Sequence, residues 1–438
     1  MPLNKLLKTA RNILIVVFFV IMPIALWLFS APFSSRFGNL EQNLTSLGRV
    51  LGLVGMSLFS LNFILSARSR FLDNIFFGLN EAYKAHHIIG AIAFILVMFH
   101  PLALAGSYAV VSLQAALYFF WPFDKGPEII FGSVALVLMT ILLVMTFYLR
   151  PRYDIWKITH KFLSLAFVFA FLHLIYIKSD VYYNPFLRAY MILISFLGMA
   201  AIIYQQFLRK IFVKSFQYRV VLAKPVNPVV TELVLSPIKE KITHIAGQFI
   251  YLKFDNPKIG KEQHPFTIAS SPNEKNLKIA VKKLGDYTEK LPLLKNQDAV
   301  FIEGPYGRFS YLLYPEKNQV WIAGGIGITP FLSMARDLNV KNLDYSIDLF
   351  YSVKDEKEAV FIDELYDISL KNPRFKARQF ISQTQGLLTA ESVQKISGQV
   401  SGKEIFICGP ASMMESLRRQ FLAMGVKNNK IHTEEFAL

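Results

Sequence analysis

The sequence predicts a helical membrane bundle of six spans, followed by a soluble β-barrel domain and a doubly wound α/β domain. Hydrophobic residues make up 53% of the 438 residues and charged residues only 18%, whereas a soluble chain is typically about a quarter charged. The charges are also unevenly spread, because residues 1–210 carry 17 Lys/Arg and 7 Asp/Glu, and residues 211–438 carry 30 and 24. These counts predict a membrane half and a soluble half that meet near Phe207–Ser215.

Six apolar runs are each long enough, at roughly 20 residues, to cross about 30 Å of hydrocarbon as a helix. The first could be taken for a secretory signal, but its length and the five runs after it favour a membrane helix. Twelve basic residues flank the spans on one side and five on the other. This bias predicts a multi-pass membrane protein with its N-terminus and soluble half in the cytoplasm. The runs are residues 12–31, 47–66, 86–107, 129–149, 156–177 and 185–206, and the expected domains are 1–210, 215–312 and 318–438.

Two features of the composition exclude other classes of protein. Cys408 is the single cysteine, which excludes a disulfide framework and a cysteine-ligated cluster. The net charge of +16 is typical of the cytoplasmic loops of a membrane protein, and no basic run interleaved with aromatic residues indicates nucleic-acid binding. The bilayer is therefore an expected partner, and the oligomeric state stays open.

Four of the eight histidines form two pairs on two expected spans. His86 and His100 are 14 residues apart on the third span, and His160 and His173 are 13 apart on the fifth. At 1.5 Å per residue each pair covers about 20 Å of helix. Both spans run in the same direction, so His86 can face His160 at the inner level and His100 can face His173 at the outer level.

Two stacked bis-imidazole sites of this kind predict axial ligation of two haem irons. Zinc would need three or four ligands gathered at one level. The alternative is that the imidazoles form only interhelical hydrogen bonds, although a histidine in the membrane is costly and usually functional.

The spacings differ in helical phase. Fourteen residues return to within about 40° of one helix face, whereas thirteen miss it by about 140°. The third span therefore favours His86 over its neighbour His87 as a ligand, without excluding His87. The fifth span needs a bulge or a shifted haem between His160 and His173.

The soluble half carries two groups of motifs. Residues 216–312 alternate apolar and polar residues as in an antiparallel barrel, and contain His264-Pro265-Phe266-Thr267-Ile268-Ala-Ser270-Ser271, Lys283-Leu-Gly285-Asp-Tyr287-Thr288 and Glu303–Gly307. Residues 318–438 alternate strand and helix. After their first strand comes Gly324-Gly325-Ile-Gly327-Ile-Thr329-Pro330, a glycine turn that suits a dinucleotide diphosphate at a helix N-terminus.

Together these motifs, with Lys84-Ala-His86-His87 and Trp156-Lys-Ile-Thr-His160, resemble the ferric reductase and NADPH oxidase superfamily, whose soluble half is a ferredoxin-reductase-type module. The resemblance implies FAD, two b-type haems and NADPH or NADH as cofactors. It implies that Phe266 and Thr267 contact the isoalloxazine, with Ile268–Ser271 and Gly285–Thr288 on the pyrophosphate. It also places Cys408-Gly409-Pro410 beside the nicotinamide and Phe436 on the flavin, which makes Thr267, Cys408 and Phe436 the expected catalytic residues. As bare sequence, however, Cys408 reads as a buried core thiol, and no nucleophile is claimed for it.

The same resemblance implies haem-propionate partners. Arg49 would bind an outer propionate or an anionic product, since the charge bias of the loops does not call for it there. Arg68, Arg70, Lys84 and Arg150 would lie near inner propionates, although the topology of the spans explains these four equally well.

Two departures from the family pattern leave questions open. Lys354 stands where NADPH-dependent members often have an arginine, and Leu387 stands at a second position that is often basic, so NADH and NADPH both remain candidates. Leu104 replaces a further histidine found in animal NADPH oxidases.

The implied activity is electron transfer from NAD(P)H through FAD and two haems to an acceptor on the outer side, with O₂ giving superoxide as the first hypothesis. A flavin is needed because nicotinamide gives two electrons at once and haem accepts one. Chelated Fe(III) and a periplasmic redox partner are the alternative acceptors. A non-enzymatic haem-binding or transport protein would not need the flavin and nicotinamide motifs.

Overall fold

The computed structural model describes residues 3–435, apart from residues 70–71, 73–74, 77, 150, 261 and 342. The chain divides into two compact units. Residues Leu6–Lys210 form a helical unit, and the unit that holds Ile211–Leu438 contains both sheets.

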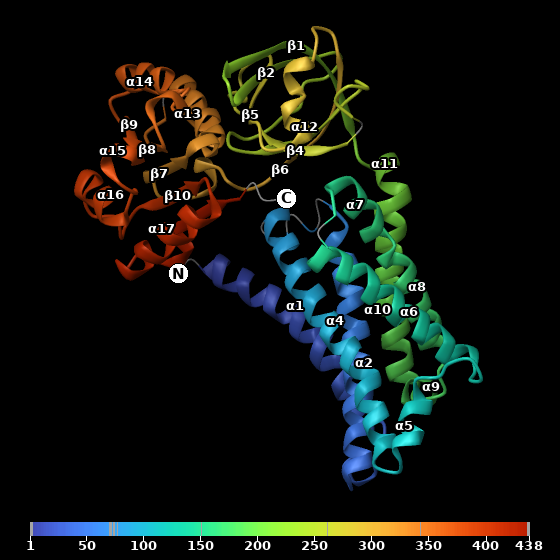
Figure 1. Ribbon diagram of the computed structural model, residues 1–438. Helices are drawn as coiled ribbons and strands as arrows, with labels where there is room; N and C mark the ends of the chain where they lie inside the picture. The colour runs from blue at the N-terminus through green and yellow to red at the C-terminus, as the bar shows by residue number, and fades with distance from the viewer. Residues whose placement is uncertain are drawn as a thin grey trace. The chain divides into compact units, whose positions relative to one another are not determined.

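Long helices run side by side in the helical unit (Figure 1). Helix α2 packs against α4 and α10, and α6 packs against α8. Short helices α5 (Leu113–Phe119), α9 (Asp180–Tyr183) and α11 (Arg209–Phe212) join or end them. The main helices are α1 (Leu3–Leu28), α2 (Leu40–Ser66), α4 (Leu79–Ala109), α6 (Pro127–Val144), α7 (Tyr153–Lys161), α8 (Leu163–Tyr176) and α10 (Pro185–Ile203), and π-helical turns extend α6 to Leu149 and α10 to Leu208.

Five helices in the described residues are long and apolar enough to cross a membrane. They correspond to the second to sixth expected spans. The first expected span also forms a helix, but its described apolar part, Leu14–Leu28, is shorter than the length required. Helix length therefore supports the second to sixth spans directly and leaves the first span as a prediction.

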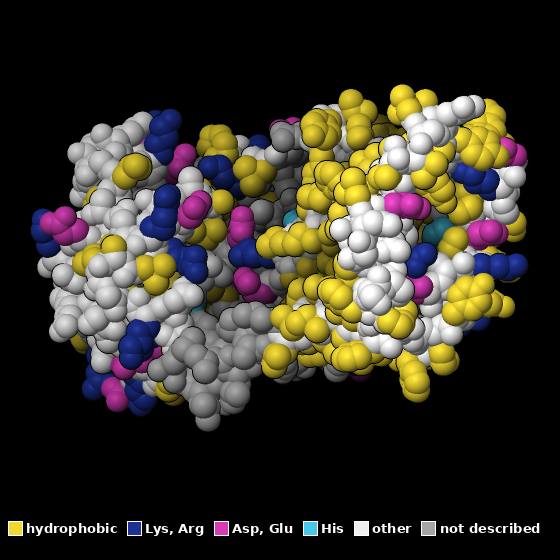
Figure 2. Space-filling model, turned by 90° about the horizontal axis from the view of Figure 1, so that it is seen from below, with side chains coloured by type: hydrophobic (Ala, Val, Ile, Leu, Met, Phe, Trp, Pro, Cys, Tyr) yellow, Lys and Arg dark blue, Asp and Glu magenta, His cyan; other side chains and the backbone are white. Residues whose placement is uncertain are grey.

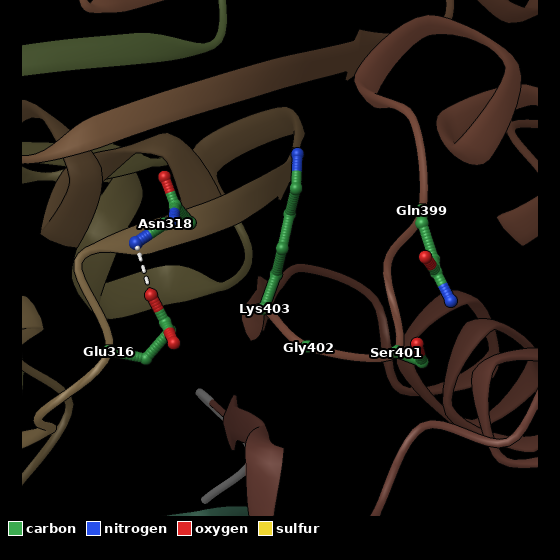
Figure 3. Close-up of a pocket in the computed structure, with 6 residues that line it drawn as sticks. All are labelled: Glu316, Asn318, Gln399, Ser401, Gly402 and Lys403. Atoms are coloured by element: carbon green, nitrogen blue, oxygen red, sulfur yellow. Dashed lines mark hydrogen bonds between the residues drawn. The ribbon is translucent and has the colours of Figure 1, made fainter.

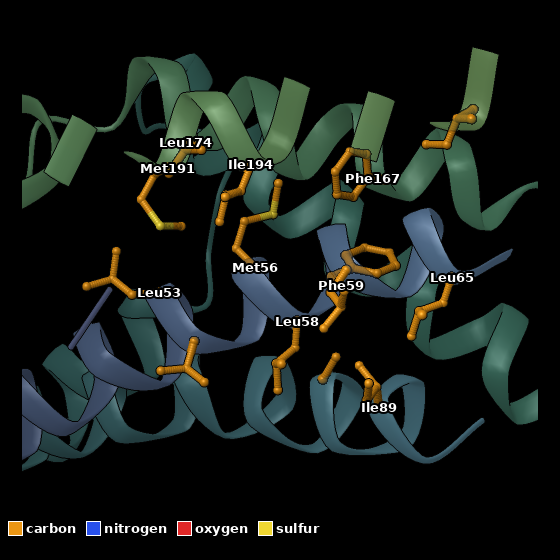
Figure 4. Packing of buried hydrophobic residues seen from close by; sticks show 14 of the residues in the cluster. Leu53, Met56, Leu58, Phe59, Leu65, Ile89, Phe167, Leu174, Met191 and Ile194 are labelled. Atoms are coloured by element: carbon orange, nitrogen blue, oxygen red, sulfur yellow. The ribbon is translucent and has the colours of Figure 1, made fainter. Parts of the chain in front are cut away.

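Helix α2 lies at the centre of the apolar core of this unit. Its side chains meet Ile89 of α4 on one side and Phe167 of α8 with Ile194 of α10 on the other (Figure 4). Many apolar side chains of α4 and α6 are exposed, and Figure 2 shows hydrophobic side chains crowding the helical unit. Such a surface suits lipid rather than water.

The expected fifth span is interrupted between its two histidines. Helix α7 ends and α8 begins around Phe162, whose N–H bonds to Thr159 O in a tighter turn. The interruption breaks the regular 100° per residue between His160 and His173. The 13-residue spacing therefore does not force these two side chains onto opposite faces.

The first sheet of the second unit has six antiparallel strands in the order β4-β3-β6-β1-β2-β5. Its core is made by inward-facing residues such as Tyr218, Leu233 and Ile250. The strands are β1 (Ser215–Asn227), β2 (Val230–Pro237), β3 (Phe249–Phe254), β4 (His264–Thr267), β5 (Leu277–Lys282) and β6 (Ala299–Tyr306), and the short helix α12 covers Asp286–Glu289.

The second sheet has five parallel strands in the order β11-β10-β7-β8-β9. This is the doubly wound α/β arrangement that the sequence predicts. The strands are β7 (Asn318–Gly324), β8 (Ser346–Val353), β9 (Phe375–Ile381), β10 (Glu404–Cys408) and β11 (Ile431–Glu434), and the helices are α13 (Thr329–Lys341), α14 (Ile362–Lys371), α15 (Ser382–Gln385), α16 (Ala390–Ser397) and α17 (Ala411–Ala423).

The barrel and the α/β sheet share an apolar cluster. Ala246 and Ala269 of the barrel lie in the same buried cluster as Trp321, Phe331 and Met334 of the α/β part. The barrel and the α/β part therefore pack together in one compact unit, so distances between their motifs are defined.

Candidate functional site

The inner histidines face each other. The ring centres of His86 and His160 are 6.3 Å apart. A metal lies about 2.0–2.1 Å from an imidazole nitrogen, and with roughly 1 Å from that nitrogen to the ring centre, two axial imidazoles place their ring centres about 6 Å apart. The distance therefore fits one iron held between the two rings.

Three of the four histidines have a carbonyl partner on a neighbouring helix or its first turn. When Nδ1–H donates to a carbonyl, Nε2 keeps its lone pair for a metal, which is the usual outer arrangement of a ligating histidine. The Nδ1 atoms lie 2.6 Å from Gly48 O for His100, 2.6 Å from Glu128 O for His173 and 3.0 Å from Asn62 O for His86.

Glycines make room for the two outer imidazoles. A Cβ atom on Gly52 would lie 2.8 Å from the His100 ring, and one on Gly132 would lie 2.9 Å from the His173 ring. Gly52 comes four residues after Gly48, whose carbonyl faces His100, and Gly132 comes four residues after Glu128, whose carbonyl faces His173. Helices α2 and α6 therefore contact the two imidazoles in the same way, through one carbonyl and one glycine. His100 and His173 are also close enough to interact electrostatically.

His160 differs from the other three. Its Nδ1 is buried without a hydrogen-bond partner in the described part of the chain, and its ring stacks on Trp156 with centres 5.0 Å apart. His87 is exposed, whereas its neighbour His86 is half-buried and bonded. The geometry favours His86 as the partner of His160.

The four histidines thus fit two haem irons better than a clustered metal site. Among the described residues, no group of three or more His, Cys, Asp or Glu side chains is placed to hold a metal ion. Leu104 lies against Gly48, since a Cβ there would meet its side chain at 2.7 Å. Figure 2 shows one histidine side chain in a hollow of the helical unit.

Arg49, expected at an outer propionate, has a carboxylate partner in the structure. Its Nη1 lies 3.1 Å from Asp180 Oδ1 and 3.0 Å from Asp180 Oδ2. The Oδ2 atom also accepts from Trp27 and from the buried Arg36. Burial raises the pKa of Asp180, but the Arg49 charge and the bonds from Trp27 and Arg36 outweigh it and lower the pKa. An ionised Asp180 therefore joins three segments of the helical unit, a role that the sequence analysis did not assign.

The expected flavin residues come together at β4. His264 stacks on Tyr287 of α12 with ring centres 3.9 Å apart, which brings the first two flavin motifs side by side. Thr267 ends β4, and its Oγ1 is buried without a hydrogen-bond partner among the described residues. Pro265 and Phe266 are half-buried. The orphaned Thr267 hydroxyl would fit a polar ring system such as isoalloxazine, whereas the Phe266 ring packs partly against the barrel core.

The turn at Gly285–Thr288 is open. A Cβ on Gly285 would meet no atom within 4 Å, and the Thr288 hydroxyl oxygen accepts from the N–H groups of Leu284 and Gly285. The Thr288 hydroxyl donates in turn to Gly285 O, so the expected role of this turn at a pyrophosphate stays a prediction.

The segment Ile268–Ser271, expected at the pyrophosphate, makes hydrogen bonds within the protein. Its role at a pyrophosphate stays a prediction. The segment is almost fully buried, and most of its donors are already used within the protein. The N–H groups of Ile268, Ala269 and Ser271 bond to Gln248 O, Lys278 O and Glu274 Oε1, and the Ser271 hydroxyl donates to Asp337.

The nicotinamide motifs also meet, at the carboxyl ends of β7 and β10. These strands are neighbours, and a Cβ on Gly327 would lie 2.2 Å from Cys408 O, so only glycine fits there. A Cβ on Gly409 would lie 2.9 Å from Gly324 Cα, and Gly325 has a φ of +52°. The turn leads into α13 at Thr329 and Pro330, both buried.

Cys408 is a buried thiol in this arrangement. Burial raises its pKa well above the usual value, so the side chain stays protonated and is no nucleophile. Phe436, the expected flavin-stacking residue, lies outside the described residues. The buried Cys408 side chain therefore contributes packing at the end of β10.

The positions expected to read a 2′-phosphate do not form a basic pocket. Lys354 follows β8 and is exposed, but Asp355 and Glu356 follow it directly. Leu387 is 84% exposed and apolar. This charge distribution leaves the choice between NADH and NADPH open.

A separate surface pocket of about 300 Å³ lies at the opposite end of the α/β sheet. It is lined by Glu316 and Asn318 at the start of β7 and by Lys403 before β10 (Figure 3). Because nucleotides bind at the carboxyl ends of parallel strands, this pocket is not the nicotinamide site.

His244 gives the barrel a pH dependence. Burial lowers the pKa of its imidazole from 6.5, an effect to which Lys241 adds and which Asp337 opposes. Below pH 6.5 the His244 imidazole binds a proton in the unfolded chain but not in the folded one, because its folded pKa is lower. The free energy of unfolding should therefore decrease as the pH decreases from 6.5 to the folded pKa, by at most about 1.4 kcal/mol per pH unit. Melting temperatures of the full-length protein between pH 5 and 7 test this. A His244→Leu variant should lose this part of the slope, and an unchanged slope would contradict the assignment.

Comparisons with known proteins agree with this arrangement. Residues 51–171 match the model of a ferric reductase like transmembrane component, residues 216–310 that of an FAD-binding domain, and residues 321–419 that of an oxidoreductase NAD-binding domain. The chain is 27% identical over 210 residues to flavohemoprotein A of Dictyostelium discoideum, covering 44% of this chain and 53% of the relative. It is 26% identical over 205 residues to the ferredoxin reductase component of 3-ketosteroid-9-alpha-monooxygenase from Mycolicibacterium smegmatis, covering 45% and 57%.

The chain spans about half the length of these curated relatives. A solved structure of flavohemoglobin from Malassezia yamatoensis, with bound FAD and heme, is similar in fold, with a TM-score of 0.51 at 20% identity over 91% of this chain and 98% of that one.

A membrane helical domain fused to FAD- and NAD-binding domains defines an oxidoreductase. The ferric-reductase-like transmembrane component followed by the ferredoxin-reductase-type FAD and NAD module matches the domain organisation of the ferric reductase and NADPH oxidase superfamily.

Proposed function

We propose that the protein transfers electrons from cytoplasmic NADH or NADPH, through FAD and two b-type haems, to O₂ on the other side of the membrane. The observation that carries the proposal is the pairing of histidines whose Nδ1 atoms face carbonyls on neighbouring elements. The overall balance is one NAD(P)H and two O₂ giving NAD(P)⁺, one proton and two superoxide ions.

The bound groups would supply the conversion of a two-electron hydride into single electrons. The chain's own residues bind and orient. The turn at Gly324–Pro330 receives the nucleotide diphosphate, and Phe266 and Thr267 face the flavin. His86 with His160, and His100 with His173, hold the irons at two levels, so that no side chain need act as an acid or a base.

The test uses purified protein with added FAD and either nucleotide, first in air and then without oxygen in the presence of ferric citrate. We expect dye reduction in air that superoxide dismutase abolishes, and much slower turnover with ferric citrate. Equal turnover without oxygen would instead make the protein a ferric-chelate reductase. Reduced haem that reacts with neither acceptor would favour a relay to a periplasmic redox partner.

A further inference from the structure

Helix α13 of the α/β part holds the buried segment of the barrel that follows β4. Three residues on consecutive turns of the helix make the contact, and we call them the α13 clamp: Ser333, Arg336 and Asp337. The Ser333 hydroxyl donates to Ser270 O at 2.7 Å, Arg336 Nη1 donates to Ala269 O at 2.8 Å, and Asp337 Oδ1 accepts from the Ser271 hydroxyl at 3.4 Å.

Each charged member of the clamp is itself fixed. Arg336 binds Glu364 of α14 through two bonds of 2.6 and 2.7 Å. Asp337, fully buried, accepts from the Tyr311 hydroxyl at 2.8 Å and from Lys341 Nζ at 2.9 Å. Buried charges with several good partners have little freedom to move, so the clamp joins the two parts at a defined distance.

The clamp lies between the two proposed cofactor sites. Helix α13 begins at Thr329, directly after the glycine turn, and the clamp residues come four to eight residues later, about 6–12 Å along the helix. On the barrel side, the clamped segment continues directly from Thr267. Helix α13 therefore connects the proposed nicotinamide turn to the proposed flavin strand. The segment Ala269–Ser271 would then serve as the attachment point of this helix on the barrel.

Hydride transfer depends steeply on this geometry, because the reacting atoms must come within about 3–3.5 Å and a 1 Å displacement can cost about 100-fold in rate. We propose that Ser333, Arg336 and Asp337 are positioning residues that set the distance between nicotinamide and flavin. This inference rests on the proposed function, since it requires both groups to bind where the motifs place them.

The test measures flavin reduction by stopped flow in the FAD-loaded, full-length protein at saturating NADH and NADPH. Ser333→Ala removes one hydroxyl, and Arg336→Lys keeps the charge but cannot hold Glu364 and Ala269 O together. Both variants should reduce flavin about 10- to 100-fold more slowly. Their affinities for FAD and NAD⁺ should be unchanged, and 4-deuterated nucleotide should show an altered kinetic isotope effect.

The matched control is Arg378→Gln, which breaks an arginine–carboxylate bond of 2.7 Å to Asp348 in the same sheet without touching the clamped segment. It should leave the rate of flavin reduction unchanged. Normal rates in both clamp variants would overturn the inference, and so would a slower rate that is fully explained by weaker FAD binding or a lower melting temperature. Failure of either nucleotide to reduce the wild-type flavin would overturn the proposed function and the inference with it.

Discussion

A His100→Ala variant is expected to bind one haem, where we propose two for the wild-type protein. The His100 side chain is half-buried, its Nδ1 lies 2.6 Å from Gly48 O, and alanine offers no ligand. The Soret absorbance of purified protein should therefore fall to roughly half, as the axial-ligand role of histidine requires. Electron delivery to the external acceptor should cease, while NAD(P)H still reduces the flavin.

His87→Ala is the matched control for the other end of the same helix. His87 is exposed and adjacent to His86, so its loss should leave haem content and turnover unchanged, whereas His86→Ala should remove the inner haem. If His87→Ala removes a haem and His86→Ala does not, the ligand assignment is reversed. If neither variant nor His100→Ala changes the haem content, the two-haem arrangement is wrong.

The arrangement of spans and motifs follows from patterns that a single sequence contains. Hydropathy identifies the helices that carry His86 and His160, and the order of the flavin and nicotinamide motifs predicts both sheets. The helix phase even requires an irregularity between His160 and His173, and the structure has one at Phe162. These features depend on local composition and spacing, which is why they can be predicted.

Contacts between distant segments were not predictable in the same way. The carbonyl partner of a histidine is a backbone atom on another helix, and any residue could supply it. Ser333 and Asp337 look like an ordinary polar helix face until the barrel covers them. The Ile268–Ser271 segment is a related case, because its motif does not reveal that Lys278 O and Glu274 Oε1 accept hydrogen bonds from its N–H groups. Arg49 similarly looked free to bind an anion until Asp180 was seen beside it.

The contact between helix α2 and His100 is an exception, because its glycine spacing is visible in the sequence. Gly48 and Gly52 are four residues apart on the second span, and small residues at this spacing allow helices to approach closely. The glycine spacing could have located the face of α2 that receives His100.

A Gly132→Ala variant is expected to lose the outer haem. Gly132→Ala would place a Cβ atom 2.9 Å from the His173 ring, and an imidazole held by Glu128 O at 2.6 Å cannot retreat without losing that bond. Because outer partners of a metal-ligating histidine are typically worth about 10- to 100-fold in metal affinity, we expect loss of the outer haem with the inner one retained. Spectra of the purified variant, and reconstitution with added haem, measure this directly.

Gly106→Ala on α4 separates this local effect from a general intolerance of alanine in the bundle. Its Cβ would make only an ordinary contact of 3.6 Å with Leu44, so both haems should be retained. Gly52→Ala should behave like Gly132→Ala, since its Cβ would lie 2.8 Å from the His100 ring. If Gly132→Ala and Gly52→Ala keep a full complement of haem, the glycines serve only helix packing, and the shared arrangement of carbonyl and glycine on α2 and α6 has no part in holding the irons.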